Sequence, residues 1–177
     1  INASVTVHGQ LKPDWQVQFK ADIHDSLFRR QRLSGHAEAA VKTDRVWNGL
    51  GRLNWGPSRA TFKGALGATG DQLEVDFNIA DLKPFDDQWT GQIKGSATFS
   101  GRMRHPGIVL DARATGIEGP HQLGIGNASL TARVVPDLNA PLTVEARLDK
   151  AKLGGLGVDH ATLSVSGTGR VHRSKLA

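Results

Sequence analysis

The sequence has no cysteine and no tyrosine, and it contains a single methionine among 177 residues. Without cysteine the chain forms no disulfide, holds no thiolate zinc site and offers no cysteine nucleophile. Aromatic residues make up only 6% of the chain, which is few for a protein that stacks nucleic-acid bases on its surface. No apolar run approaches the length of a bilayer-spanning helix. These absences exclude the disulfide-stabilised and thiol-dependent classes of protein.

Glycine, in contrast, is present in excess. It accounts for 21 of 177 residues, or about 12%, where a typical domain has about 7%. Glycine is unfavourable inside helices and is used where a backbone bends, bulges or packs closely. The composition therefore favours a sheet-rich fold. The net charge of +5 is spread along the sequence and suits the phosphates of nucleic acids and of lipid head groups alike.

Alternation of apolar and polar residues is the dominant pattern, and it predicts half-buried strands. The two longest alternating stretches cover residues 91–104 and 160–172. Shorter ones cover residues 15–23, 73–79, 128–134 and 142–148. Together they predict roughly ten to twelve strands with long one-sided faces.

Turn-forming residues separate these stretches and favour antiparallel neighbours. They lie at residues 12–14, 56–58, 69–71, 119–120 and 136–141. One short helical turn is predicted at residues 25–33, capped by Asp25 or Ser26. An irregular excursion is predicted at residues 84–89. Neither is long enough for a βαβ crossover, so an all-β fold is expected.

A loose internal repeat is also visible. Ser-Gly pairs end at Gly35, Gly101 and Gly167, which are 66 positions apart in each step, and each glycine is expected inside an alternating strand. Such spacing is typical of stacked supersecondary units that bury their apolar faces against neighbours. We expect residues 1–177 to be a single all-β segment cut from a larger protein, because the chain opens at Ile1 in a strand-like pattern.

No arrangement of residues predicts catalysis, a cofactor or a metal site. The seven histidines are dispersed, and His160 and His172 lie about 40 Å apart along an extended strand. Asp86 and Asp87 are adjacent carboxylates, but successive residues rarely converge on one substrate atom, so a solvated loop is expected. Residues 123–129 lack the third glycine and the helix of a phosphate-binding loop, and a turn or bulge before a strand is expected there.

Basic residues cluster at 29–32, at 102–104 and at 170–175. These clusters suit phosphates, but base stacking is poorly supported because Phe62, Phe77 and Phe99 fall on the apolar side of their strands. We therefore expect a solvated outer face and no nucleic-acid partner.

From about Trp47 to the end, the order of elements resembles the C-terminal region of the TamB family of AsmA-like bridge proteins. Residues 1–46 fit as more of the same strand pattern. The resemblance rests on many weak features, which are the segments 68–75, 80–82, 91–97, 100–101, 105–106 and 163–169, followed by His172.

The resemblance implies an elongated, curved, antiparallel-rich sheet, taco-like or solenoid-like, with an apolar interior or open groove. It also implies a periplasmic location, a parent protein anchored in the inner membrane of a Gram-negative bacterium, and a TamA-like outer-membrane partner of the Omp85 type. The implied roles are non-enzymatic. They are assembly of outer-membrane and autotransported proteins and passage of phospholipid between membranes.

The residues themselves support a trough, since long one-sided strands without helices must fold on each other or leave a groove. Its cargo would be phospholipid or an unfolded outer-membrane protein. The alternatives are a closed sandwich in which the same residues merely pack, and a structural spacer or docking module with an exposed strand edge. The candidate groove-lining residues are Leu73, Val75, Phe77, Ile79, Ile93, Phe99, Leu110, Leu130, Val144, Leu148, Leu163 and Val165.

Overall fold

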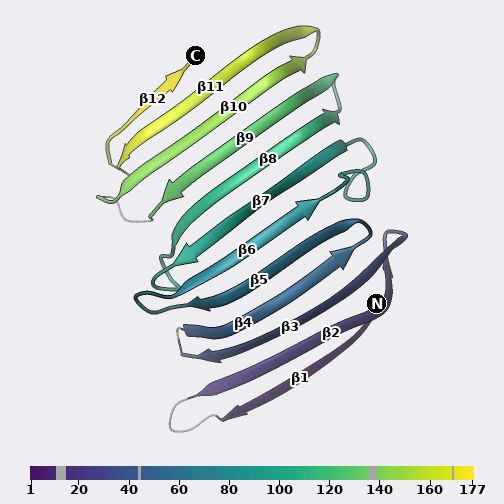
Figure 1. Cartoon of the computed structure of the whole chain (residues 1–177), viewed down its shortest axis with the longest axis vertical. Coiled ribbons are helices and arrows are strands. Elements are labelled where there is room, and N and C mark those ends of the chain that lie inside the picture. Colours follow the sequence, from purple (N-terminus) through teal and green to yellow (C-terminus); the bar gives the residue numbers. More distant parts are fainter. Residues whose placement is uncertain (11–14, 44, 136–138, 169) are drawn as a thin grey trace. The chain divides into compact units, whose positions relative to one another are not determined.

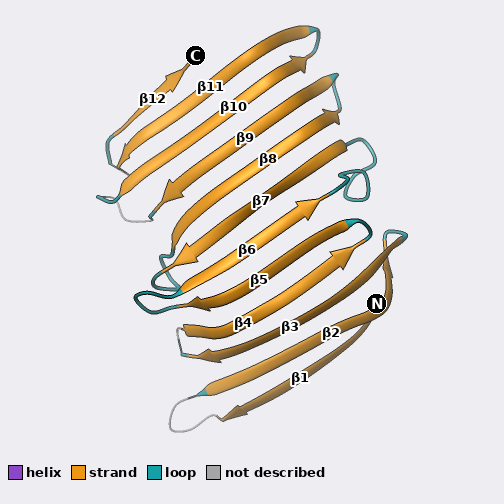
Figure 2. Ribbon diagram, in the orientation of Figure 1, coloured by secondary structure: helices purple, strands orange, loops and turns teal. Residues whose placement is uncertain are grey.

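The computed structural model describes residues 1–10, 15–43, 45–135, 139–168 and 170–177. Within these ranges the chain consists of strands joined by turns and loops, and no helix is present (Figure 2). Accordingly, none of the described residues belongs to a helix that is long and apolar enough to cross a membrane. The predicted all-β class is confirmed.

Twelve strands occur among the described residues, as predicted from the alternation. They are β1 (Asn2–Gln10), β2 (Gln16–Phe28), β3 (Gln31–Lys42), β4 (Arg45–Trp55), β5 (Ser58–Leu66), β6 (Gln72–Ile79), β7 (Thr90–Ser100), β8 (Gly107–Gly119), β9 (Leu123–Val134), β10 (Pro141–Leu153), β11 (Leu156–Thr168) and β12 (His172–Leu176).

The strands form one sheet in which they follow each other in chain order (Figure 1). Neighbours from β1 to β5 and from β8 to β12 pair antiparallel. The contacts within the chain define two compact units. Unit 1 comprises Ile1–Phe77 with Thr98–Pro106, and unit 2 comprises Asn78–Ala97 with Gly107–Ala177.

Unit 1 is a series of hairpins interrupted by β-bulges. The register shifts between Ile23 and Ser26 in β2 and between Val46 and Gly49 in β4. A bulge inserts one extra residue and bends the strand. Asn48 has a φ of +53°, a backbone conformation that asparagine tolerates better than most residues. The bulge in β4 therefore changes the phase of the alternation within one strand.

Unit 2 is more regular. From β8 to β11 the pairing continues without a register shift. The hairpin from β10 to β11 closes through Gly154 and Gly155, whose φ values are +54° and +89°. Two positive φ values define a type I′ turn, which matches the twist of the flanking strands and favours glycine.

Little of the chain is fully buried. Among the described residues only Ala40, Leu66, Ala97 and Ile117 form a buried hydrophobic core, and no large side chain is completely enclosed. A single sheet layer can only half-bury the side chains on its faces. The apolar residues of the strands therefore remain partly accessible.

The helical turn predicted at residues 25–33 is wrong. β2 continues to Phe28, Arg29 and Arg30 form a tight turn, and β3 starts at Gln31. The bulge and the turn together break the alternation, which made this stretch look helical. The irregular excursion at 84–89 is confirmed, with turn hydrogen bonds from Phe85 N to Leu82 O and from Trp89 N to Asp86 O.

Both of the longest predicted strands end earlier in the structure than predicted. β7 ends at Ser100, and the stretch from 160 to 172 is divided between β11 and β12. Turns at 56–58, 69–71 and 119–120 fall at strand breaks as predicted, whereas residues 12–14 and 136–138 lie outside the described residues. The turn or bulge predicted within 123–129 is wrong, since β9 already begins at Leu123 and pairs with both neighbours without a register shift.

Of the three glycines in the proposed repeat, Gly35 lies in β3 and Gly167 lies in β11. Gly101 follows the end of β7, so its predicted place inside a strand is wrong. A turn there replaces the strand because Gly101 adopts a φ of +81°. The repeat itself stays a prediction.

Candidate functional site

The strand register decides which side chains share a face. Residues that are directly opposite each other in an antiparallel pair project to the same side of the sheet, and successive residues project to opposite sides. Following the partners from β1 to β5 therefore traces each face of unit 1, and following them from β8 to β11 traces each face of unit 2.

One side of unit 1, which we call its apolar face, contains apolar residues and glycine at nearly all of these paired positions, and its polar exceptions are Ser26, Gln31 and Ser58. Leu73 and Val75 of β6 join it, because Leu73 approaches Gly49 and Val75 lines a hollow with β2 to β5. The residues traced by register are Ala3, Val5, Val7, Gly9, Val17, Phe19, Ala21, Ile23, Gly35, Ala37, Ala39, Val41, Val46, Gly49, Gly51, Leu53, Ala60, Phe62, Gly64 and Leu66.

Unit 2 has an apolar face of its own. Its opposite side is polar at most positions, with Arg113, Thr131, Glu145 and Arg147 among the residues there. The apolar face of unit 2 consists of Ile108, Leu110, Ala112, Ala114, Ala128, Leu130, Ala132, Val134, Leu142, Val144, Ala146, Leu148, Ala161, Leu163 and Val165.

Small residues make a hollow in the apolar face of unit 1. The Phe62 ring lies across Gly51 of the neighbouring strand, in space that the Cβ of any other residue would occupy. Around it the face forms a depression of about 280 Å³. The depression is lined by Ala21, Ile23, Gly35, His36, Ala37, Arg52, Leu53, Ala60, Thr61, Phe62 and Val75.

Charged side chains pair across strands on the opposite side of unit 1. His36 Nδ1 lies 2.6 Å from Asp22 Oδ1, and its Nε2 lies 3.2 Å from Glu38 Oε1. Lys20 Nζ lies 3.1 Å from the same Glu38 oxygen. The hydrogen bond with His36 lowers the pKa of Asp22, and the hydrogen bond from Lys20 lowers the pKa of Glu38. This side keeps charged groups solvated and paired.

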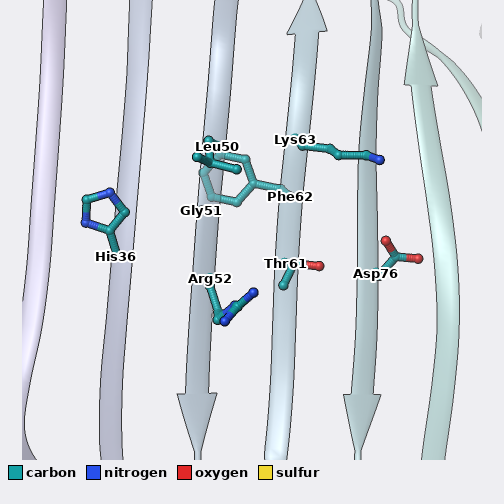
Figure 3. Close-up of a pocket in the computed structure, with 8 residues that line it drawn as sticks. All are labelled: His36, Leu50, Gly51, Arg52, Thr61, Phe62, Lys63 and Asp76. Carbon is teal, nitrogen blue, oxygen red and sulfur yellow. The ribbon is translucent and has the colours of Figure 1, made fainter.

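A second hollow of about 480 Å³ lies on this charged side (Figure 3). His36, Arg52 and Thr61 are consecutive partners in the register, and Figure 3 shows Asp76 on the next strand beside Thr61. Leu50 and Lys63 form the adjoining row. The hollow is therefore a shallow depression lined by polar side chains together with Leu50, Gly51 and Phe62.

Asp71 closes one end of unit 1. Its carboxylate accepts two hydrogen bonds from Arg45, from Nε and from Nη2, each 2.8 Å long. It also accepts a hydrogen bond from the Ala68 backbone N–H at 2.8 Å. The hydrogen bonds from Arg45 lower the pKa of Asp71, and only 8% of the residue is exposed. Asp71 thus fixes the turn before β6 against the start of β4.

The candidate groove-lining residues whose face is given by a strand pairing or a contact all lie on an apolar face. Leu110, Leu130, Val144, Leu148, Leu163 and Val165 lie together on the apolar face of unit 2. Leu73 and Val75 lie on that of unit 1. Phe77 and Ile79 continue the alternation of β6, and Ile93 and Phe99 share one side of β7. Their role as a lining stays a prediction.

Sequence reasoning missed most of the apolar face of unit 1. The residues left out of the candidate lining are on β1 to β5 and include Ala21, Ala37 and Leu53. Phe62 was expected on the apolar side of its strand but was also left out of the lining. In β2 the alternation from Val17 to Ile23 indicated which residues lie on the apolar side. In β3 to β5 the signal is weak, because alanine and glycine contribute little hydrophobicity and a bulge shifts the phase in β4.

Among the described residues no group of three or more histidine, aspartate or glutamate side chains is placed to bind a metal ion. His160 Nδ1 lies 2.7 Å from Asp149 Oδ1 of the adjacent strand, which is a cross-strand pair. Asp86 lies in the loop before β7, where its carboxylate accepts a hydrogen bond from the Gln88 N–H at 3.0 Å.

The family comparison matches the whole chain. The family model described as TamB, N-terminal domain, covers residues 1–177. No curated protein and no solved structure matched the chain. The resemblance to the C-terminal region was wrong about the position within the family, because alternating strands occur throughout such a sheet and do not identify one part of it. The chain belongs to the TamB family, and its match is to the N-terminal domain of that family.

Proposed function

We propose that this chain is a segment of a TamB-like bridge between the inner and outer membranes, in which its apolar faces shield phospholipid acyl chains or client β-strands. The observation that carries the proposal is that one side of the sheet in each unit is apolar. Among the described residues no helix or second sheet covers these sides. Large accessible apolar surfaces mark binding sites in soluble proteins.

Burial of an acyl chain supplies the driving force without any catalytic group. Each methylene removed from water contributes about 0.8 kcal/mol. The depression beside the Phe62 ring, where small residues such as Ala37 and Ala60 line the face, leaves room for an alkyl chain. A row of partly exposed alkyl side chains binds by area and not by specific hydrogen bonds, which suits passage of a cargo along the surface.

Membership of the TamB family supports the cellular setting of the proposal. In that setting the parent protein is anchored in the inner membrane and spans the periplasm of a Gram-negative bacterium. Its partner is an outer-membrane barrel of the Omp85 type, similar to TamA. The bridge would support assembly of outer-membrane proteins and autotransporters together with lipid transport.

Photocrosslinking from neighbouring positions of one strand tests the role of the apolar face. A photoreactive amino acid at Leu130 projects from the apolar face of unit 2, and one at Thr131 projects from the opposite side. We expect phospholipid or client adducts from position 130 and almost none from position 131. Introducing Leu163→Glu, on the strand next but one, should reduce the adducts because a charge on the face disfavours apolar cargo.

The structural spacer remains the competing function, and it makes a different prediction. A spacer gives no selective adduct at position 130, and no phospholipid copurifies in native mass spectrometry after gentle extraction. Equal adducts from positions 130 and 131 would also contradict the proposal. Adducts to protein but not to lipid would identify unfolded outer-membrane protein as the cargo.

A further inference from the structure

The hairpin between β2 and β3 ends in two arginines with an unfavourable backbone conformation. Phe28 pairs with Gln31, so Arg29 and Arg30 form the entire loop. Their φ values are +48° and +65°. This combination defines a type I′ turn, whose usual residues are Asn-Gly or Gly-Gly. Side chains larger than these crowd the backbone in this conformation.

Two other hairpins of the chain use glycine where φ is positive, whereas Thr43 after β3 and His121 and Gln122 after β8 also have positive φ values. Gly154 and Gly155 form the turn between β10 and β11, with φ values of +54° and +89°. Gly56, with φ of +54°, starts the turn between β4 and β5. The fold thus builds the same kind of turn from glycine elsewhere. An observed departure from the preferred residues is grounds for seeking a function.

Apolar side chains are exposed on both sides of the sheet directly behind the two arginines. Leu27 is 67% exposed and Phe28 is 44% exposed, and as successive strand residues they project to opposite sides. The rings of Phe28 and Trp55 lie 5.5 Å apart. The Arg29 guanidinium lies 6.0 Å from the centre of the Phe28 ring.

Arg32, which is exposed, pairs with Leu27 in the register and adds a third positive charge. We define the arginine tip as Leu27, Phe28, Arg29, Arg30, Arg32 and Trp55. Its charge and its exposed apolar groups lie within one hairpin and the strand end beside it.

We propose that the arginine tip contacts the surface of a membrane that contains anionic phospholipids. Guanidinium groups bind phosphate through paired, charge-assisted hydrogen bonds. Phenylalanine, tryptophan and leucine side chains suit the interfacial zone beside those phosphates. The proposal does not depend on what the apolar faces carry.

The position of Leu27 favours a membrane over other anionic partners. A single lipid lying along the apolar face of unit 1 would meet Phe28 and Trp55 but not Leu27, which projects to the other side. A nucleic acid would leave the exposed leucine without an apolar partner. A bilayer interface surrounds the hairpin and accommodates apolar groups from both sides.

The double substitution Arg29→Asn/Arg30→Gly provides the test in the full chain. It removes two charges and gives the type I′ turn its preferred residues, so the melting temperature should stay the same or rise. Binding is measured by cosedimentation with vesicles of equal parts phosphatidylglycerol and phosphatidylcholine. We expect about fivefold weaker binding for each arginine removed, hence roughly thirtyfold for the pair.

The matched control is Arg102→Gln/Arg104→Gln, which removes the same charge from an exposed turn after β7. It should leave vesicle binding nearly unchanged, and vesicles of phosphatidylcholine alone should bind the unmodified chain weakly. Leu27→Ser leaves the turn intact and should also weaken binding, because it removes an exposed apolar group. This variant tests the contact even if the Asn-Gly turn alters folding.

The proposal is overturned if Arg29→Asn/Arg30→Gly binds anionic vesicles as well as the unmodified chain. It is also overturned if both arginine pairs reduce binding equally, since bulk charge would then explain the effect. If Arg29→Asn/Arg30→Gly loses binding to a DNA duplex but still binds vesicles, the tip is assigned to nucleic acid instead.

Discussion

Asp71 connects three segments of unit 1 through one residue. Its carboxylate accepts hydrogen bonds from Arg45 and from the Ala68 N–H. Its own carbonyl oxygen accepts a hydrogen bond from the Gly101 N–H at 3.4 Å. Charge-assisted, bidentate hydrogen bonds are stronger than neutral ones. The residue therefore holds a turn, a strand start and a distant loop in one arrangement.

The stabilisation from Asp71 should depend on pH. Arg45 lowers its pKa in the folded state below the ordinary value of about 3.9. The unfolded state then binds more protons in the acidic range, so stability falls as the pH falls. Asp71→Asn should reduce the free energy of unfolding at pH 7. Urea unfolding should show the whole difference in free energy of unfolding between the variant and the unmodified chain above about pH 4. This difference should shrink as the pH falls through the lowered pKa of Asp71.

Asp111→Asn is the matched control for Asp71→Asn, because it removes one exposed carboxylate from β8. It should leave the stability at pH 7 nearly unchanged. A constant difference between Asp71→Asn and the unmodified chain from pH 7 to pH 2 would show that the charge of Asp71 does not contribute.

Glycine in the strands of unit 1 is explained by close approach. The Phe62 ring occupies the space beside Gly51, an arrangement that shields the backbone of a strand glycine. At Gly64 a Cβ would meet the backbone carbonyl of Gln72, and the φ of +120° disfavours any other residue. At these two positions close packing between strands within one layer requires glycine.

At the scale of elements, the bulge in β4 keeps apolar residues on one face. Val46, Gly49 and Gly51 all lie on the apolar face. The first two are three residues apart because of the bulge, and the last two are two residues apart as in a regular strand. Removing Asn48 from the sequence would restore a strict alternation. The bulge therefore contributes local bending while the apolar side chains of β4 stay on the apolar face.

Deletion of Asn48 should therefore be tolerated. The deletion removes a strained residue and leaves every other residue of β4 on its present face, so the free energy of unfolding should change by no more than about 1 kcal/mol. Deletion of Thr131 in the regular strand β9 is the control. It should cost on the order of 4 kcal/mol, because at least two apolar side chains move to the polar side.

Urea unfolding followed by circular dichroism measures both deletions. If deleting Asn48 lowers the free energy of unfolding as much as deleting Thr131 does, the bulge at Asn48 is not what keeps the apolar residues of β4 on one face.

The fold was largely predictable from the sequence because alternation with period two survives in strands such as β6 and β10. The strand class, the strand number and the turn at 56–58 followed directly from that pattern. The hairpin at Arg29 and Arg30 was not predictable, since arginine is an unusual residue for a type I′ turn. Cross-strand contacts such as that of Arg45 with Asp71 depend on the strand register. The register shifts at β-bulges, and the sequence alone does not show where these bulges lie.

At the scale of the whole molecule, the described part of the chain has apolar surface but little enclosed core. Most globular domains gain stability by packing a second layer over such a surface. Here only four hydrophobic residues are buried and no large side chain is fully enclosed. An occupant of the apolar faces would therefore act as part of the missing layer.

Ligand binding should consequently raise the thermal stability of the chain. A ligand that binds only the folded state at 100 times its Kd adds about 2.7 kcal/mol, which for a chain of this size raises Tm by roughly 5–11 °C. A lysophospholipid below its micelle concentration is a suitable probe in differential scanning fluorimetry. The Tm should rise with its concentration, whereas glycerophosphate without an acyl chain should have no effect. Leu130→Lys should reduce the shift, while Thr131→Lys on the same strand should preserve it. Equal shifts in both variants would place the ligand elsewhere than on the apolar face.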